Sequence, residues 1–202
     1  MFKGDAMREL LKVAAAAALI GLGGCAGTDF VRPDTESLKN GQTTYAEVVA
    51  RMGKPWRDGT VVKNEKTIQH VTYAYAATAG QPLRPGVTPA RAAGFYFHNG
   101  TLVGHEFISS WATDNTDFDD NKVKEIAKGK TTRAQLTQLL GKPAGAYVHP
   151  MIKAEAGDAA VYAYAETSGS AFNLKFYRKV LVVTFDAAGV VADIDFSSSG
   201  NR

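Results

Sequence analysis

The stretch GQTTYAEVVARMGKP, Gly41–Pro55, recurs as GKTTRAQLTQLLGKP, Gly129–Pro143. The Thr-Thr pair and the Gly-Lys-Pro ending have the same spacing in both copies. Further along the chain, Tyr73–Ala76 and Tyr162–Ala165 both read YAYA. These two stretches are 89 residues apart, one more than the 88 residues that separate the two copies of the motif. Similarity that continues beyond one motif indicates an internal duplication, in which each copy is long enough to form a unit of its own.

Each copy of the motif predicts a short helix with both ends marked. In the first copy, Thr44 and Glu47 have the spacing of a capping box, in which the two side chains satisfy free backbone N–H groups. Apolar residues then follow at helical spacing. Gly53 suits the left-handed residue that ends a helix, and Pro55 prevents its continuation. The second copy has the same pattern, with Gln135 in place of the glutamate.

Downstream of each helix, the apolar period changes to that of a strand. Stretches rich in β-branched and aromatic residues predict strands within residues 67–76, 94–109, 159–166 and 180–197. The sequences at His98–Gly100 and Asp186–Gly189 indicate hairpin turns. A second short helix is expected just before each motif, and the proline-bearing insert Ala79–Ala92 is expected to be a surface loop.

We therefore predict an α+β fold of two tandem repeats, each with two short helices packed on a roughly three-stranded antiparallel sheet. The expected boundaries are residues 34–112 for the first repeat and residues 113–200 for the second. An apolar interface between the repeats would stabilise both, because a unit of this size buries only modest surface by itself.

The N-terminus has the features of a secretory signal peptide over residues 1–24. A charged start is followed by the apolar run Val13–Leu22. This run is shorter than the about 20 residues that a membrane-spanning helix needs. Translation from Met7 rather than Met1 would give a more compact signal.

The sequence LGGC at Leu22–Cys25 resembles the bacterial lipobox, whose cysteine is acylated and becomes the first residue of the mature protein. Cys25 is the only cysteine in the chain. The resemblance implies three acyl chains on Cys25, and two or more chains hold a protein firmly on a membrane. Ala26 favours the outer membrane, because an aspartate there would indicate inner-membrane retention. We expect a lipid anchor at the periplasmic face of the outer membrane, with residues 25–33 as a tether; the alternative is a soluble secreted protein.

The composition is that of a globular protein. Of the 202 residues, 45% are hydrophobic and 21% are charged, and the formal net charge of +3 is not gathered into a basic stripe. We therefore expect no nucleic-acid partner. With its only cysteine acylated, the chain forms no disulfide, so its stability depends on its core.

The duplicated motif, placed after a lipobox and before short strands, resembles the SmpA/OmlA (BamE-like) domain of outer-membrane lipoproteins. That domain has two helices on a three-stranded antiparallel sheet, and the resemblance covers Val31–Ser110 and Asp119–Ser199. The tandem arrangement is similar to that of beta-lactamase inhibitory protein, which has a concave sheet surface. The resemblance implies a protein that binds or assembles other proteins. The assembly-factor lipoprotein has a single copy of the domain, so a direct role in barrel assembly does not follow.

The candidate partner-binding residues are aromatic or basic. Exposed aromatic side chains and arginine are typical of protein interfaces, although aromatic residues also cover small cores. His105 is equivalent to Ile194 in the second copy. It is either a polar group or pH-sensitive contact in a groove between the repeats, or a partly buried histidine with a hydrogen-bond partner. A groove lined by His105, Tyr73 and Tyr162 would indicate a ligand site. The complete set is Trp56, Arg57, Tyr73, His105, Trp111 and Tyr162.

We expect no catalytic, metal or cofactor site. The four histidines lack metal-ligand spacing, and the acidic stretch Asp114–Asn121 is not followed by the glycine and glutamate of a calcium loop. The Gly-x-Ser-x-Gly motif of a hydrolase nucleophile is absent, and the only cysteine is assigned to lipid.

Three functions are consistent with these features. The first, which we favour, is a non-enzymatic, lipid-anchored module for protein interaction or envelope assembly. The second is an inhibitor that binds a periplasmic enzyme through its concave sheet. The third is a protein that binds a small ligand or peptidoglycan.

Overall fold

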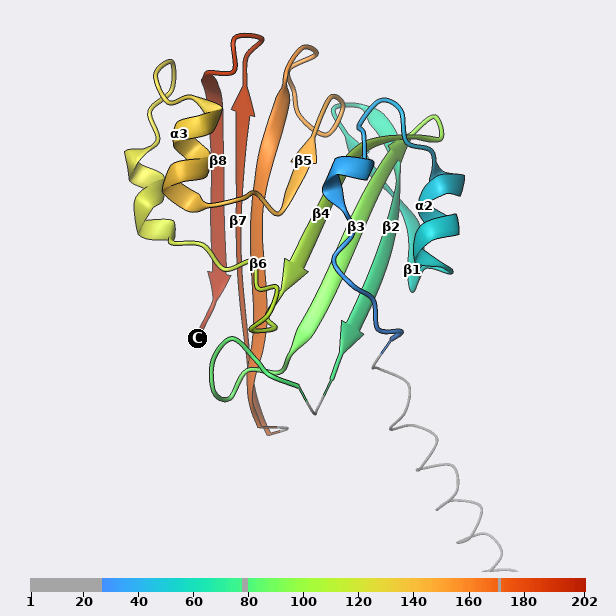
Figure 1. Cartoon of the computed structure of the whole chain (residues 1–202), viewed down its shortest axis with the longest axis vertical. Helices are drawn as coiled ribbons and strands as arrows, with labels where there is room; N and C mark the ends of the chain where they lie inside the picture. Colours follow the sequence, from blue (N-terminus) through green and yellow to red (C-terminus); the bar gives the residue numbers. More distant parts are fainter. Residues whose placement is uncertain (1–26, 78–79, 171) are drawn as a thin grey trace, which may run out of the picture.

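The computed structural model describes residues 27–77, 80–170 and 172–202 as one curled antiparallel sheet of eight strands with a few short helical segments (Figure 1). Strands make up 48% of the chain and helices 14%. The predicted fold class is therefore wrong, because the strands do not form two separate sheets that each belong to a helix-containing repeat. They follow one another across a single sheet in the order of the sequence, β1 to β8.

The elements occur in the same order in both halves of the chain, in agreement with the duplicated sequence. The first half contains η1 (Thr35–Ser37), α2 (Tyr45–Met52), β1 (Arg57–Lys63), β2 (Lys66–Ala76), β3 (Ala90–His98) and β4 (Thr101–Ser109). The second half contains η2 (Asp120–Glu125), α3 (Arg133–Leu140), β5 (Gly145–Tyr147), β6 (Asp158–Ser170), β7 (Asn173–Phe185) and β8 (Val191–Gly200). The short helices expected before each motif are the 3-10 segments η1 and η2.

Strand β5 joins the two halves into one sheet. It pairs with β4 on one side and with β6 on the other. Strands β4 and β5 approach closely at Gly145, where a Cβ atom would clash with the carbonyl oxygen of His105. A glycine is therefore required at the join.

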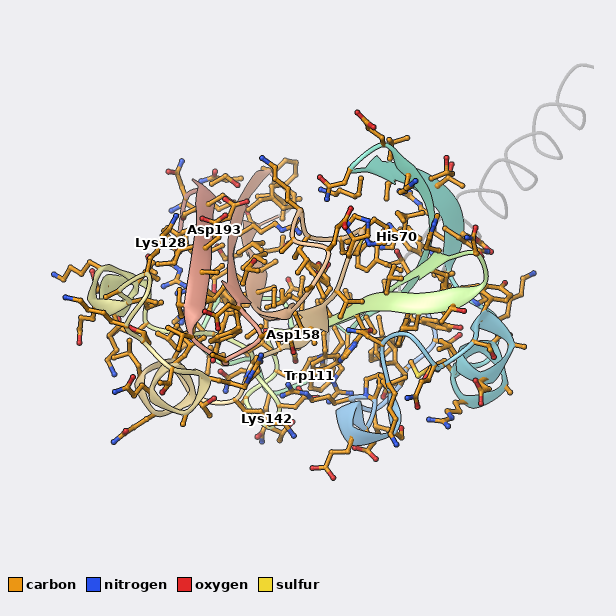
Figure 2. The ribbon with its side chains drawn as sticks, turned by 90° about the horizontal axis from the view of Figure 1, so that it is seen from above. His70, Trp111, Lys128, Lys142, Asp158 and Asp193 are labelled. Atoms are coloured by element: carbon orange, nitrogen blue, oxygen red, sulfur yellow. The ribbon has the colours of Figure 1, made fainter. Side chains whose placement is uncertain are left out.

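The sheet curls so that helices α2 and α3 lie on its outer, convex side (Figure 2). Val48 of α2 belongs to a buried cluster with Phe95 and Phe107, and Leu136 of α3 belongs to one with Leu181. These two clusters place one face of each helix against the convex side of the sheet, as the apolar period of the motif predicts.

A third buried cluster lies on the concave side and crosses the join between the halves. It includes Ile68 of β2, Tyr96 of β3 and Val161 of β6, together with Ile152 from the segment between β5 and β6. The concave side is therefore packed at its centre by side chains from both halves of the chain.

Both predicted capping boxes are present. In α2 the Thr44 hydroxyl accepts a hydrogen bond from the Glu47 N–H, and the Glu47 carboxylate accepts one from the Thr44 N–H at 2.7 Å. Thr132 and Gln135 make the equivalent pair of bonds in α3. The helix starts are thus confirmed in atomic detail.

Each helix end is held by a tyrosine from the sheet. The Tyr73 hydroxyl donates to the carbonyl oxygen of Gly53 at 2.8 Å, and Tyr162 donates to that of Gly141 at 2.9 Å. The two glycines have φ values of 77° and 83°, which other residues rarely adopt. The predicted glycine ends are confirmed, but ψ values of −162° and −169° place them outside the left-handed helical region.

We expect Tyr73→Phe to lower the free energy of unfolding by about 1 kcal/mol, because the partly buried hydrogen bond between the Tyr73 hydroxyl and the Gly53 carbonyl is lost. Tyr162→Phe should have an effect of the same size. Urea denaturation measures both, and Tyr177→Phe is the control, since among the described residues that hydroxyl is bonded only to the exposed Ser198 hydroxyl, at 3.4 Å. Equal stabilities for Tyr73→Phe and Tyr177→Phe would contradict the role of the buried bond.

The insert before β3 contacts the second half of the sheet rather than lying free on the surface. The Thr88 N–H donates to the Thr167 carbonyl oxygen at 2.8 Å, and the Gly169 N–H donates to the Gly86 carbonyl oxygen at 3.3 Å. Val87 is buried. Arg84 forms ion pairs with Asp117 and Glu166 from the second half. The insert is therefore a second connection between the halves, at the opposite end of the strands from segment 148–157.

Candidate binding face

The concave side of the sheet is hollowed in two places. We name the hollow that includes Asn64 and Met151 the upper hollow and the one that includes Gly27 and Ala90 the lower hollow. The upper hollow has a volume of about 1040 Å³ and the lower hollow about 530 Å³. Arg178 and Ser199 line both, so the two hollows are neighbours on the same face. In the view of Figure 2, His70 and Asp193 lie on opposite sides of the curl, and His70 points into it.

A hydrogen-bonded polar cluster forms the floor of the upper hollow. The Glu106 carboxylate of β4 accepts from the Tyr96 hydroxyl of β3 at 3.1 Å and from the Tyr147 hydroxyl of β5 at 2.6 Å. Burial, reinforced by the nearby Glu106 charge, raises the pKa of both tyrosines well above the ordinary value. Both hydroxyls therefore remain protonated donors at neutral pH, and the Glu106 side chain is held in one position.

His70 stacks on Tyr96 with the two rings 4.4 Å apart and nearly parallel. Burial lowers the pKa of His70, although Glu106 opposes the shift, so the neutral imidazole is favoured. Gly94 makes room for this arrangement, because a Cβ atom there would lie 3.3 Å from His70 Nε2 and 3.4 Å from Glu106 Cγ. The result is a fixed set of acceptors and aromatic faces suited to recognition of a polar partner.

The lower hollow is lined mainly by small apolar side chains. Its rim carries Trp56 and Phe176, whose exposed fractions of 58% and 62% are high for large apolar residues. Gly27, the first described residue, also lines it. Its remaining apolar lining comes from Ala74, Ala76, Ala90, Ala92, Ile108 and Ala165.

The structure places two of the predicted binding residues at the start of β1. The Arg57 guanidinium lies 4.9 Å from the centre of the Trp56 ring, and Trp56 is exposed at the rim of the lower hollow. Trp111 is half-buried instead, stacked against Tyr75 and within 4.5 Å of the Arg91 guanidinium.

The other three candidates lie under the convex side and line neither hollow. Tyr73 and Tyr162 are buried and bonded to the helix ends, and burial raises the pKa of Tyr162 to about 12. His105 is 6% exposed, and its Nδ1 atom has no hydrogen-bond partner among the described residues. Burial, with a smaller contribution from Arg32, lowers the pKa of His105 to about 4. The expected groove lined by His105, Tyr73 and Tyr162 is not formed.

The acidic stretch Asp114–Asn121 is neutralised by basic side chains of the protein. Asp114 pairs with Arg91 at 3.0 Å, and Asp117 pairs with Arg84 at 2.8 Å and with Lys179 at 2.9 Å. Among the described residues, no group of histidine, cysteine, aspartate and glutamate side chains could hold a metal ion.

Sequence reasoning missed the polar cluster of the upper hollow. Glu106 lies in the middle of an otherwise uncharged strand, and this is the one signal that could have drawn attention to it. A charged residue at a strand centre is uncommon unless it is paired. Its hydrogen-bond partners, Tyr96 and Tyr147, come from the strands on either side, β3 and β5, so the cluster follows only from the register of the sheet.

No known protein family, no curated protein and no solved structure matches this chain. The resemblance to the SmpA/OmlA domain therefore rests on the motif residues alone. Residues 1–26 lie outside the described part of the structure, and with them the expected signal peptide and Cys25. Within the described residues, none of the helices has the length and apolar character to cross a membrane.

Proposed function

We propose that this protein is a non-enzymatic lipoprotein that binds another envelope protein through the concave side of its sheet. Acylated Cys25 anchors it at the periplasmic face of the outer membrane. The observation that supports binding is the upper hollow, a polar, open depression on a face that the helices leave uncovered.

The size and lining of the upper hollow favour a protein segment over a small molecule. Its volume of about 1040 Å³ is at the upper limit of the about 300–1,000 Å³ that is usual for small-ligand sites. Small-ligand sites are mostly apolar, whereas this hollow includes His70, Glu106, Arg178 and Asp195. Polar groups that are already fixed in position reduce the entropic cost of binding a partner loop.

The inhibitor hypothesis uses the same face and differs only in the kind of partner. The rigid Glu106 cluster is compatible with both, because it can recognise a loop of an enzyme as well as one of an assembly component. The two are distinguished once a partner is recovered: an enzyme that loses its activity in the complex supports inhibition, and any other partner supports an assembly role.

Neighbouring serines on β8 provide a matched test of the binding face. Ser197 lines the upper hollow, whereas Ser198 lies on the opposite side of the strand and contacts Tyr177. We expect Ser197→Arg to reduce recovery of the partner from solubilised membranes by at least about tenfold, which corresponds to about 1.4 kcal/mol. Ser198→Arg adds the same charge and bulk but should leave recovery unchanged. Equal recovery with both variants would overturn the assignment of this face.

The anchor has a separate test. We expect Cys25→Ser to move the protein from the membrane fraction to the soluble fraction, because two or more acyl chains supply the membrane affinity. Cell fractionation with immunoblotting measures this. A Cys25→Ser protein that still sediments with outer membranes would contradict lipid anchoring.

A further inference from the structure

We propose that one acyl chain of the lipid on Cys25 lies in the lower hollow of the concave side while the other chains hold the membrane. This inference rests on the proposed acylation of Cys25. It assigns an occupant to the lower hollow, which the binding of a partner in the upper hollow leaves unexplained.

The lower hollow has the chemistry of a site for an aliphatic chain. Alanine side chains from β2, β3 and β6 line it, together with the exposed aromatic residues Trp56 and Phe176. Its volume of about 530 Å³ is within the usual range for small-ligand sites. Large exposed aromatic residues beside an apolar depression are unfavourable in water, so an apolar occupant would stabilise this region.

The described chain begins at the mouth of this hollow. Gly27 forms a β-bridge with Tyr75 and is itself one of the lining residues. Its φ of +67° and its close approach to the Ala74 carbonyl oxygen both require glycine. The next residues are also held, because Arg91 pairs with Asp29 at 3.1 Å and donates to the Phe30 carbonyl oxygen.

Cys25 precedes Gly27 by two residues. Consecutive Cα atoms are 3.8 Å apart, so the Cα atom of Cys25 lies within about 7 Å of that of Gly27. Any acyl chain attached to Cys25 therefore begins close to the apolar lining. No other source of an aliphatic chain is tied to this position by the covalent structure of the protein.

Membrane anchoring does not need all three acyl chains. Two chains are enough for stable anchoring, whereas the lipobox resemblance implies three. Transfer of the third chain from the bilayer to the lower hollow exchanges one apolar environment for another, so it costs little hydrophobic free energy. It would also hold the membrane-proximal end of the sheet close to the lipid surface.

Photo-crosslinking of the acylated full chain in intact cells tests this inference. The probe p-benzoylphenylalanine replaces Phe176, an exposed residue of the lower hollow, or Thr184, in the upper hollow. After illumination and proteolysis, we expect the peptide that contains position 176 to be joined to the N-terminal lipopeptide and the peptide that contains position 184 not to be. A probe at Thr167, which also lines the lower hollow, repeats the test if the first variant does not fold.

Filling the hollow supplies the second arm. Ala92→Phe places a larger side chain in the alanine-lined part of the hollow and should abolish the crosslink from position 176, while Ser198→Phe, on the convex side, should not. Crosslinking of position 176 to a free phospholipid or fatty acid, or equal yields at positions 176 and 184, would overturn the inference.

The mass of the N-terminal peptide separates this inference from the proposed function. An unacylated Cys25 would refute both the anchor and the inference. An acylated Cys25 without the crosslink would refute the inference alone and leave the anchored binding protein intact.

Discussion

The variant Lys179→Ala is expected to lower the free energy of unfolding by about 3 kcal/mol. The Lys179 side chain is 1% exposed, and its ammonium group lies 2.9 Å from the carboxylates of Asp117 and of Asp120. It also donates to the carbonyl oxygen of Phe118. Removal of one partner from a buried ion pair costs about 3–5 kcal/mol, because the remaining charge is left without compensation.

The effect should lie at the lower end of that range. Asp117 keeps Arg84 at 2.8 Å and Arg202 at 3.2 Å when the lysine is removed. The carboxylate is therefore not left alone, but it loses its most deeply buried cation. Burial alone would raise the pKa of Asp117, yet hydrogen bonds from Arg84 and Lys179 hold it below its usual value.

The matched control is Lys128→Ala. Lys128 pairs with Asp193, but both side chains are more than half exposed, so the loss should be less than about 1 kcal/mol. Urea denaturation of the two variants beside the wild-type protein measures the difference. Equal midpoints for Lys179→Ala and Lys128→Ala would show that the buried network does not stabilise the fold.

The second large effect is a loss of stability in mild acid that depends on His105. In the unfolded chain an imidazole binds a proton below about pH 6.5, whereas in the folded protein burial lowers the pKa of His105 to about 4. Between these values the unfolded state binds more protons, so stability falls as the pH falls from 6.5 to 4. The shift corresponds to about 3 kcal/mol, and this residue causes no further loss below pH 4.

The variant His105→Gln should remove most of this slope, whatever its stability at pH 7. His70, whose pKa burial also lowers, contributes in the same direction, so the double variant with His70→Gln should have the flatter profile. The carboxyls of Asp117 and Asp120 also have lowered pKa values. The stabilisation that they provide is lost only as the pH falls below about 4, which is outside this window. An unchanged slope in His105→Gln, measured by urea denaturation from pH 4 to 7, would contradict the burial of a neutral imidazole.

The local structure of the helices could be predicted because its determinants are close in sequence. Thr44 and Glu47 are three residues apart, and Gly53 ends the helix that they start. The hairpin at His98–Gly100 is likewise encoded by its turn, in which Asn99 and Gly100 have φ values of 51° and 77°. Such features depend on short-range bonds and do not change when the surrounding sheet is different.

Strands β1 and β5 could not be predicted, because neither shows an apolar period in the sequence. Without β5, which joins the two halves, the single sheet could not be predicted either. Strand β5 has only three residues, and β1 has exposed side chains at all positions but Val61. An edge strand of this kind buries too little for alternation to be recognised. Its turn at Asn64 and Glu65 also lacks the glycine that usually marks a hairpin with two positive φ values, 45° and 63°.

The candidate site could not be predicted in full for the same reason, because it depends on which strands lie side by side. Trp56 and Arg57 were predicted as partner-binding residues; Trp56 lines the lower hollow, and Arg57 lies against its ring. Tyr73 and Tyr162 were noticed because they are duplicated, but the duplication reflects their structural bonds to the helix ends. The cluster of Glu106, by contrast, assembles only when β5 is placed beside β4.

The most direct test of the central claim is photo-crosslinking of the full chain to its partner in intact cells. One probe replaces Thr184, which lines the upper hollow, and the other replaces Thr137, which is exposed on α3 at the convex side. We predict a crosslinked protein adduct of defined mass from position 184 and none from position 137. An adduct from position 137 without one from position 184 would contradict a binding function for the concave side.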